Sequence, residues 1–487
     1  MNATAIRPRA SNLDVTVVGL GILLIGASAA TGKAPGLVAP AVATLVLFVT
    51  TRLAVIEWRA IFLGLLLIIL FIPIRRYSLA INLPFQLEPY RLYVILMAAV
   101  WATFLLLDRR LRIRAMGMEG PFALLGIAVL GSIVTNFNSI THEDLSAEVV
   151  KKLTFWVGFM VVLYMLASLS SRADVDLYLR SLVLGTALLG ALGVVEWKTG
   201  MNVFAHLDRY VPFIAPVGDQ LDTFRAGLNR AYGSAQHPIA FGAALALVLP
   251  IAVVLAFRRR KPIWFASVAL ILMGTLASIS RTSLIMVAVG AVVLALVKPR
   301  AAREAVPFIL PLLVAIQIAL PGSLSTVRAQ FFPSGGLVKE QAAAQAGSGR
   351  VASFGPAVDE ASRHPFFGRG FGTRIVEVTN PHRNSFILDD EWLSSTLEVG
   401  LVGVIAWVWI FGRFCSRAVR AARAGDEDDH WLLAGLAASV ASFAVGMAFF
   451  DAFSFIQVTF IAIIVIGLGS VLLRDTAPGR SPAPQAR

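Results

Sequence analysis

Long, nearly uninterrupted runs of apolar residues fill most of this 487-residue chain and constrain its fold more than any other feature. A run of about 20 apolar residues is long enough to cross a bilayer as a helix. Only 15% of the residues are charged, whereas soluble domains carry roughly 25%. The sequence therefore predicts an all-α polytopic membrane protein.

The apolar runs predict fourteen spans, or twelve or thirteen if one of the shorter early runs is re-entrant. The predicted spans are residues 13–30, 36–51, 60–74, 90–107, 121–136, 153–169, 177–197, 239–257, 262–278, 282–297, 305–320, 386–412, 431–450 and 452–473. A polar loop at 198–238 and a longer one at 321–385 interrupt them. The chain thus divides into spans 1–11 within 1–320, a large loop at 321–385, three spans within 386–473 and a disordered tail at 474–487.

The first apolar run also has some features of a signal peptide. Arg7 and Arg9 precede it, and Ala27-Ser28-Ala29 resembles a signal-peptidase site. We favour an uncleaved first span, because the charge pattern accommodates it.

Basic residues between the spans predict the orientation. With the N-terminus in the cytoplasm, every second connection is cytoplasmic, and these connections are rich in Arg and Lys, as the positive-inside rule requires. Arg75, Arg76 and Arg91 are the exception. The prediction is a multi-pass protein of the inner (plasma) membrane with both termini cytoplasmic and both long loops extracytoplasmic.

Net charge and cysteine content narrow the possible partners. The formal charge of +13 comes from short clusters between spans, so we expect membrane lipids and no nucleic acid as partners. The single cysteine, Cys415, excludes an intrachain disulfide and a cysteine-based metal cluster.

Two polar motifs lie at helix boundaries in the middle of the chain. The first is Arg230-Ala-Tyr-Gly-Ser-Ala-Gln-His237-Pro238, where the planar guanidinium of Arg230 suits a phosphate and His237 precedes a helix start. The second, Ser280-Arg281-Thr282-Ser283, joins two apolar runs almost without a loop. An Arg in that place must snorkel, pair or line a polar cavity, and a helix N-terminus favours an anion. The simpler alternatives are an interfacial anchor with a helix N-cap for the first motif and a snorkelling Arg for the second.

A third motif, from His364 to Gly372, carries glycines at 368, 370 and 372 around Arg369. Glycines permit tight turns and close approach of backbones. Because the strand–turn–helix context of a nucleotide-binding loop is missing, we favour a structural turn. The preceding segment, Arg350 to His364, has Val351, Phe354, Val358 and Ala361 at helical spacing, which predicts an amphipathic helix.

A fourth motif, Asn380-Pro-His382-Arg-Asn384-Ser385, precedes the twelfth predicted span. A histidine titrates near neutral pH and is a natural general base for a hydroxyl; a helix cap with an incidental histidine is the alternative. Within that span lies Glu398, and a carboxylate inside a membrane usually has a partner or a function. We expect it to pair with an arginine of these motifs.

The sequence contains no established motif for a metal site or a catalytic nucleophile. There is no Gly-x-Ser-x-Gly, Walker loop or histidine pair at metal spacing. Asp389, Asp390 and Glu391 could hold a divalent ion, but a solvated helix start is the favoured interpretation.

Taken in order, these motifs resemble the bacterial O-antigen ligase and O-antigen polymerase superfamily. The similar segments are RAYGSAQHP, SRTS at a helix junction, RHPFFGRGFG, PHRNSF and LEVGLVG, within 230–403. One departure is Arg383, which separates the histidine from the asparagine.

The resemblance implies a GT-C-like membrane glycosyltransferase that transfers or polymerises a glycan from an undecaprenyl-diphosphate-linked donor onto a glycan or lipid acceptor. It implies no cofactor, no nucleotide sugar and no metal, and an inverting reaction at the extracytoplasmic face. By motif, the family's two arginines and histidine correspond to Arg230, Arg281 and His382. The predicted substrate-binding residues are Arg350, His237, Arg369, Asn384 and Glu398.

Two other functions remain open from the sequence. A transporter or flippase for lipid-linked or anionic solutes also needs many apolar spans with few buried charges, but internal repeats and broken helices are not evident. A scaffold for an envelope complex is the third.

Overall fold

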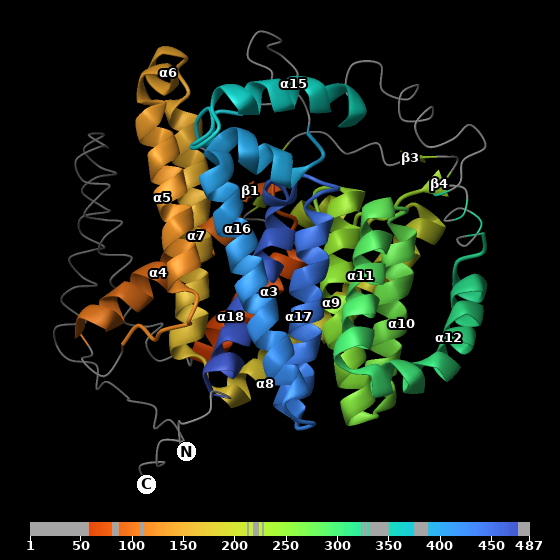
Figure 1. Cartoon of the computed structure of the whole chain (residues 1–487). Coiled ribbons are helices and arrows are strands. Elements are labelled where there is room, and N and C mark those ends of the chain that lie inside the picture. The colour runs from red at the N-terminus through yellow and green to blue at the C-terminus, as the bar shows by residue number, and fades with distance from the viewer. Residues whose placement is uncertain are drawn as a thin grey trace, which may run out of the picture.

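A computed structural model describes residues 58–79, 87–107, 112–211, 214–217, 224–225, 228–322, 325, 328, 331, 350–374 and 388–475. These residues form a bundle of roughly parallel and antiparallel helices with short elements gathered at one end (Figure 1). The all-α polytopic membrane class is confirmed.

In the described part of the chain, seven helices are long and apolar enough to cross a membrane, or eight if one bent pair is a single span. The seven are α4 (Pro89–Leu107), α7 (Ser146–Leu169), α8 (Arg172–Thr199), α9 (Pro238–Arg259), α16 (Glu391–Arg423), α17 (Asp428–Gly446) and α18 (Ile456–Asp475). Shorter apolar helices occupy four further predicted spans: α3 (Trp58–Phe71), α5 (Glu119–Thr135), α10 (Pro262–Ala277) and α11 (Arg281–Val297). The bent pair is α12 (Pro299–Ala319), with a 44° bend beside Phe308.

The predicted spans 13–30 and 36–51 lie outside the described residues. The total of twelve to fourteen spans therefore stays a prediction.

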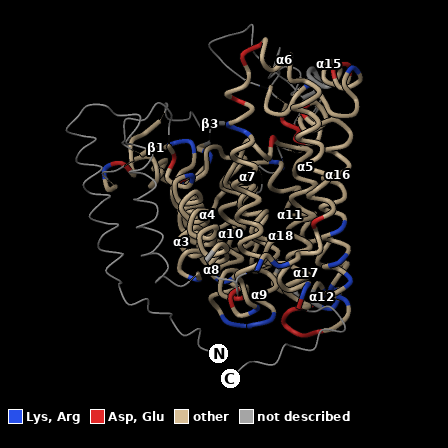
Figure 2. Tube along the Cα trace, turned by 90° about the vertical axis from the view of Figure 1, so that its left-hand side faces the viewer, with Lys and Arg blue, Asp and Glu red and all other residues tan. Residues whose placement is uncertain are grey.

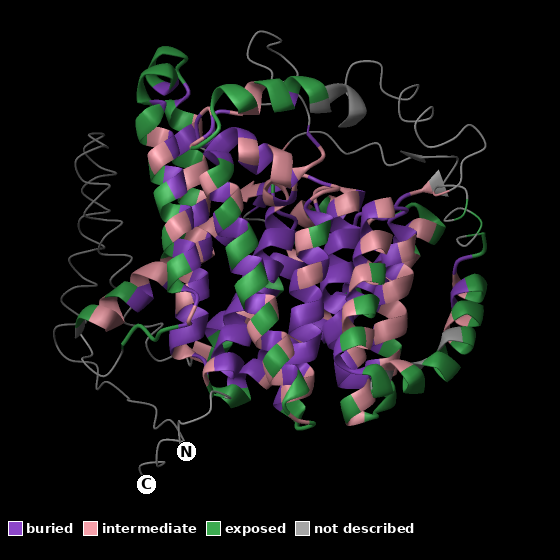
Figure 3. Cartoon of the chain, viewed as in Figure 1, coloured by how far each residue is buried: buried purple, intermediate pink, exposed green. Residues whose placement is uncertain are grey.

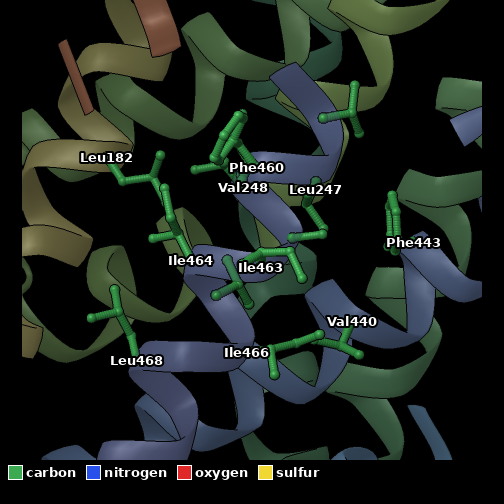
Figure 4. Packing of buried hydrophobic residues seen from close by; sticks show 14 of the residues in the cluster. Leu182, Leu247, Val248, Val440, Phe443, Phe460, Ile463, Ile464, Ile466 and Leu468 are labelled. Atoms are coloured by element: carbon green, nitrogen blue, oxygen red, sulfur yellow. The ribbon is translucent and has the colours of Figure 1, made fainter. Parts of the chain in front are cut away.

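Helix α18 forms the centre of the bundle. Its most apolar stretch is wholly buried, and α9 is almost as enclosed. Ile463, Ile464 and Ile466 point in different directions from α18 and meet side chains of several other helices (Figure 4). A helix that is apolar on every side is expected in such a central position. Exposed apolar residues lie on the outer helices instead, where lipid would cover them (Figure 3).

The end of the bundle where α9 finishes and α10 begins is rich in charge, and we call it the basic end (Figure 2). Ion pairs there join helix ends that are distant in sequence: Arg172 with Asp429 at 2.5 Å, Arg258 with Asp428 at 2.6 Å and Lys298 with Asp426 at 3.0 Å. The Lys298 ammonium donates a hydrogen bond that lowers the pKa of the exposed Asp426 carboxyl. Each pair has at least one partner open to solvent, and water screens such pairs, so their main consequence is to mark one polar end.

The opposite end, where α8 finishes and α9 begins, carries the short elements, and we call it the loop end (Figure 1). Two strands, β1 (Tyr77–Leu79) and β2 (Ile214–Pro216), pair antiparallel with Tyr77 opposite Pro216. Strands β3 (Phe224–Arg225) and β4 (Leu228–Asn229) form a second small pair. The remaining short elements there are α6 (Phe137–His142), η1 (Val203–Arg209), η3 (Ala452–Ser454) and α15 (Arg350–Arg363).

Helix α15 confirms the helix predicted after Arg350 and lies across the loop end (Figure 1). The predicted apolar face is wrong in part: Val358 is exposed, whereas Ala357 is buried with Leu388 and Leu397. The helix packs on α16 through small residues, so its contact face is rotated from the one that periodicity suggested.

Candidate active site

The turn that follows Arg230 is anchored by a buried carboxylate that the sequence did not single out. Glu196, in the last turn of α8, accepts hydrogen bonds from the backbone N–H groups of Gly233 at 2.9 Å and Tyr232 at 3.3 Å. Arg76 covers the other side, 4.7 Å from the centre of the Tyr232 ring, and donates to the Gly233 carbonyl at 3.3 Å. Burial raises the pKa of the Tyr232 hydroxyl. Arg76, one of the three exceptions to the positive-inside pattern, therefore has a structural role.

The first two predicted motifs meet at the loop end. The Nε–H group of the buried Arg230 donates to the Ser278 carbonyl at 3.1 Å, and the next backbone N–H, of Ala231, donates to the Ala277 carbonyl at 3.0 Å. These contacts hold the Arg230 guanidinium against Ser278, which is three residues before Arg281 in the sequence. The turn between α10 and α11 is thus bound to the segment before α9.

Backbone strain marks the same turn. Ile279 has a φ of 50°, a left-handed conformation that is a genuine outlier for a β-branched residue. Strain of this kind gathers at functional sites. Ser280 then caps α11, with its hydroxyl accepting from the Ser283 N–H at 3.4 Å. Arg281 is the first residue of α11 and half-buried, so a cation stands at a helix N-terminus.

A segment that sequence reasoning missed, Met447 to Gln457, links this turn to its surroundings. Its Phe449 carbonyl accepts from the Thr282 hydroxyl at 3.2 Å, and its Ser454 carbonyl accepts from Gln236 at 3.0 Å. The His237 ring stacks on Phe455 with ring centres 5.9 Å apart. The only hint in the sequence was Asp451, an acid between two apolar runs.

His237 has the structural role that was weighed as its alternative. Its Nδ1 accepts from the Ile239 N–H at 3.1 Å, so the side chain caps α9. A role in substrate binding stays a prediction.

The glycine-rich third motif is a structural loop that docks into a break in α16. Gly400, ten residues into the helix, has φ 64° and ψ −167°. The loop carbonyls of Pro365 and Phe366 accept from the Leu401 and Val402 N–H groups at 2.8 and 3.2 Å. In return, the Arg369 N–H donates to the Leu397 carbonyl at 2.8 Å.

Helix α5 completes this arrangement. The Ser132 hydroxyl donates to the Glu398 carbonyl at 2.6 Å, and the Asn136 amide donates to the Gly368 carbonyl at 3.0 Å. An unsatisfied backbone group in a membrane costs several kcal/mol. The loop and α5 therefore take over groups that the helix break would otherwise leave unpaired.

The expected partner of Glu398 is corrected by the structure. Among the residues that the structure describes, the buried Glu398 carboxylate forms its ion pair with Lys152 of α7, and not with the expected arginine. Among the predicted binding residues, Arg369 is also engaged, because its guanidinium donates to Glu360 of α15 at 2.5 Å.

The prediction of a solvated acidic helix start is wrong for Glu391. Asp390 does cap α16, with its carboxylate accepting from the Leu393 N–H at 3.1 Å. Glu391 is buried, and its carboxylate accepts from the Phe453 N–H at 2.9 Å and the Ser395 hydroxyl at 3.3 Å. A cavity of about 10 Å³, enough for roughly one water molecule, lies between Lys152, Glu391 and Glu398.

Three predicted residues remain outside this geometry. His382 and Asn384 lie outside the described residues. Arg350 is the first residue of α15, and its side chain is also outside the described part.

Comparison with known families finds a match over a segment that includes both the strained turn between α10 and α11 and the docked loop. Residues 266–408 match the family model for O-antigen ligase. This segment is similar to O-antigen ligase domains. It runs from α10 through α11, α12 and α15 to the part of α16 beyond the break. No curated protein sequence matches the chain.

The matched segment contains Arg281, Glu398 and the docked loop, whereas Arg230, Lys152 and Asp451 lie outside it. It supports the O-antigen ligase and polymerase superfamily, and with it glycan transfer in the family's broad sense, on a multi-pass membrane scaffold. The match covers under a third of the chain. The structure adds that residues from the earlier helices close around this segment.

Proposed function

We propose that the protein is a glycosyltransferase of the O-antigen ligase or polymerase type that acts at the extracytoplasmic face of the inner membrane. Its donor is a glycan on undecaprenyl diphosphate, and its acceptor is a hydroxyl of a glycan or lipid. The observation that carries the proposal is the hydrogen bond from Arg230 to the Ser278 carbonyl, because it brings the two cationic motifs to one turn.

In the proposed reaction, the acceptor oxygen attacks the anomeric carbon of the donor sugar from the side opposite the phosphate. The bond from that carbon to the phosphate oxygen breaks, and the diphosphate leaves with the electron pair. The acceptor proton passes to His382. Direct displacement inverts the configuration at the anomeric carbon.

Charge stabilisation is the part that Arg230 and Arg281 would supply. Negative charge grows on the diphosphate as the bond breaks, and fixed guanidinium groups in a water-poor site stabilise it strongly. Their permanent charge and planar donors suit phosphate. Cleavage of the activated sugar–diphosphate bond drives the transfer, so the proposal includes neither ATP nor a metal ion.

Orientation follows from the charge pattern. The basic end carries Arg258, Arg259, Arg260 and Lys261 in one connection, which favours the cytoplasmic side. The strained turn and the docked loop would then face outward, where a lipid-linked glycan is presented.

A transporter gains no support from the broken helix. Transporters use the freed backbone groups of such breaks to hold substrates or ions. Here the loop residues Pro365, Phe366 and Arg369 occupy those groups. The break therefore serves the protein's own packing.

Purified protein in liposomes with a lipid-linked glycan donor and an acceptor tests the proposal. Wild-type protein should release polyprenyl diphosphate in proportion to the glycan transferred, without a second compartment. His382→Ala should lower kcat by at least about 10²-fold, the usual contribution of a general base. The measurement is product analysis by gel and mass spectrometry.

The control for this experiment is His206→Ala in η1, at a histidine that the proposed mechanism does not use. It should keep wild-type activity. Transfer at the wild-type rate by the His382 variant would refute the role of that histidine. Solute movement across the liposome membrane without product would favour the transporter.

A further inference from the structure

The break in α16 is connected by the Lys152–Glu398 ion pair to α7, a helix outside the segment that matches the O-antigen ligase family. Gly372 of the docked loop lies so close to α7 that a methyl group added to it would be 3.0 Å from the Val149 Cα atom and 3.3 Å from the Lys152 Cβ atom. The Lys152 ammonium lies 5.5 Å from the centre of the Phe371 ring. Lys152 therefore contacts both partners of the docking, the loop and the broken helix.

We infer that Lys152 is a positioning residue, which holds the loop of residues 364–373 in the α16 break through its ion pair with Glu398. This inference concerns the geometry of the break, and its consequence for catalysis rests on the proposed function. Lys152 is distant in sequence from every motif that the sequence analysis singled out.

Electrostatics explains why the pair would act on the loop. Glu398 is the second residue before Gly400, and its side chain is buried. Removing one partner of a buried ion pair leaves an uncompensated charge, which destabilises a fold much more than removal of both partners. An unpaired Glu398 would turn toward water, and the adjacent backbone would lose its hydrogen bonds to Ser132 and Arg369.

The neighbouring residue offers a matched control. Lys151 pairs with Glu148 at 3.3 Å, and half of its side-chain surface is exposed. Exposed pairs within one helix contribute little to stability. Lys151→Met and Lys152→Met thus make the same chemical change at adjacent positions, and only the second removes a contact with the break.

Hydrogen–deuterium exchange on the full-length protein in detergent tests the inference without any substrate. In Lys152→Met, the amides of Arg369, Leu401 and Val402 should exchange about tenfold faster or more, because each donates across the docked loop. Lys151→Met should match the wild type. The double variant Lys152→Met/Glu398→Gln should exchange more slowly than Lys152→Met alone, because the carboxylate that loses its ion-pair partner is neutralised as well.

Lys152→Arg keeps the charge and should stay near the wild-type exchange rate, which guards against simple failure of Lys152→Met to fold. Wild-type exchange in Lys152→Met, or equal acceleration in Lys151→Met, would overturn the inference.

The activity arm uses the liposome assay. The docked loop leads directly into the segment that carries His382, so Lys152→Met should lower kcat with little change in the donor KM, and Lys152→Arg should restore it. Faster exchange with unchanged kcat would overturn the positioning role. If the wild-type protein transfers no glycan, the proposed function fails, while the exchange measurements still decide whether Lys152 holds the loop.

Discussion

Replacement of Arg230 or Arg281 by alanine should lower kcat for glycan transfer by about 10²- to 10³-fold each, the usual effect of removing one donor that stabilises charge in a transition state. The physical reason is that water taking the place of either guanidinium would carry no positive charge to stabilise the departing diphosphate. The measurement is single-turnover transfer in liposomes at saturating donor.

Lysine substitutions separate charge from geometry at these two positions. Arg230→Lys keeps a positive charge but cannot donate from an Nε–H to Ser278 while presenting a planar fork. We therefore expect it to recover less activity than Arg281→Lys, whose side chain starts at the helix N-terminus itself.

Arg209→Ala is the control for both arginine experiments, because Arg209 is exposed in η1 at the same end of the bundle. It should change kcat by less than about twofold, as expected for a surface residue. Protein amount and thermal stability are measured for every variant. Alanine variants that are well folded and retain half of the wild-type kcat would refute the proposed roles.

Replacement of Gly400 by alanine should destabilise the protein strongly. A Cβ atom at Gly400 would lie 2.3 Å from the Phe366 carbonyl oxygen and 2.6 Å from the Gly368 nitrogen. Its φ of 64° with ψ of −167° belongs to a region that only glycine adopts readily. Strain and overpacking together should cost roughly 2–5 kcal/mol.

The same helix provides the control for Gly400. A Cβ atom at Gly412 would have no neighbour within 4 Å, and alanine is favoured over glycine in a helix by about 0.5–1 kcal/mol. Gly412→Ala should therefore be neutral or slightly stabilising. The measurement is the fraction of monodisperse protein after heating in detergent. Equal stability of the two variants would show that the loop does not dock at the break.

The apolar runs predicted the helices well because a membrane span needs little beyond length and hydrophobicity. Each predicted span from 60–74 onward has a counterpart, such as α9 for 239–257 and α18 for 452–473. The ends differ by a few residues, most at α16, which continues to Arg423, beyond its predicted end at residue 412. At the basic end, the helix continues past its apolar run through a segment that contains several arginines.

The candidate site could be predicted only in part. The polar motifs marked Arg230 and Arg281 because charged residues at span ends are rare enough to stand out. Nothing in the sequence indicated that Glu196 would bind the turn after Arg230, or that Lys152 would pair with Glu398. These partners lie on other helices, and the separation in sequence between two buried charges carries no information about their distance in space.

The sequence by itself determined that this is a many-helix membrane protein, which helix ends carry its unusual polar residues, and to which superfamily they point. These are properties of local composition and order, and a membrane enforces them directly on each segment. Only the tertiary structure decided that the third motif docks into a broken helix and that Arg230 binds the turn before Arg281. Such contacts depend on how neighbouring helices place their backbone groups, and a bilayer requires each of those groups to find a partner wherever packing allows.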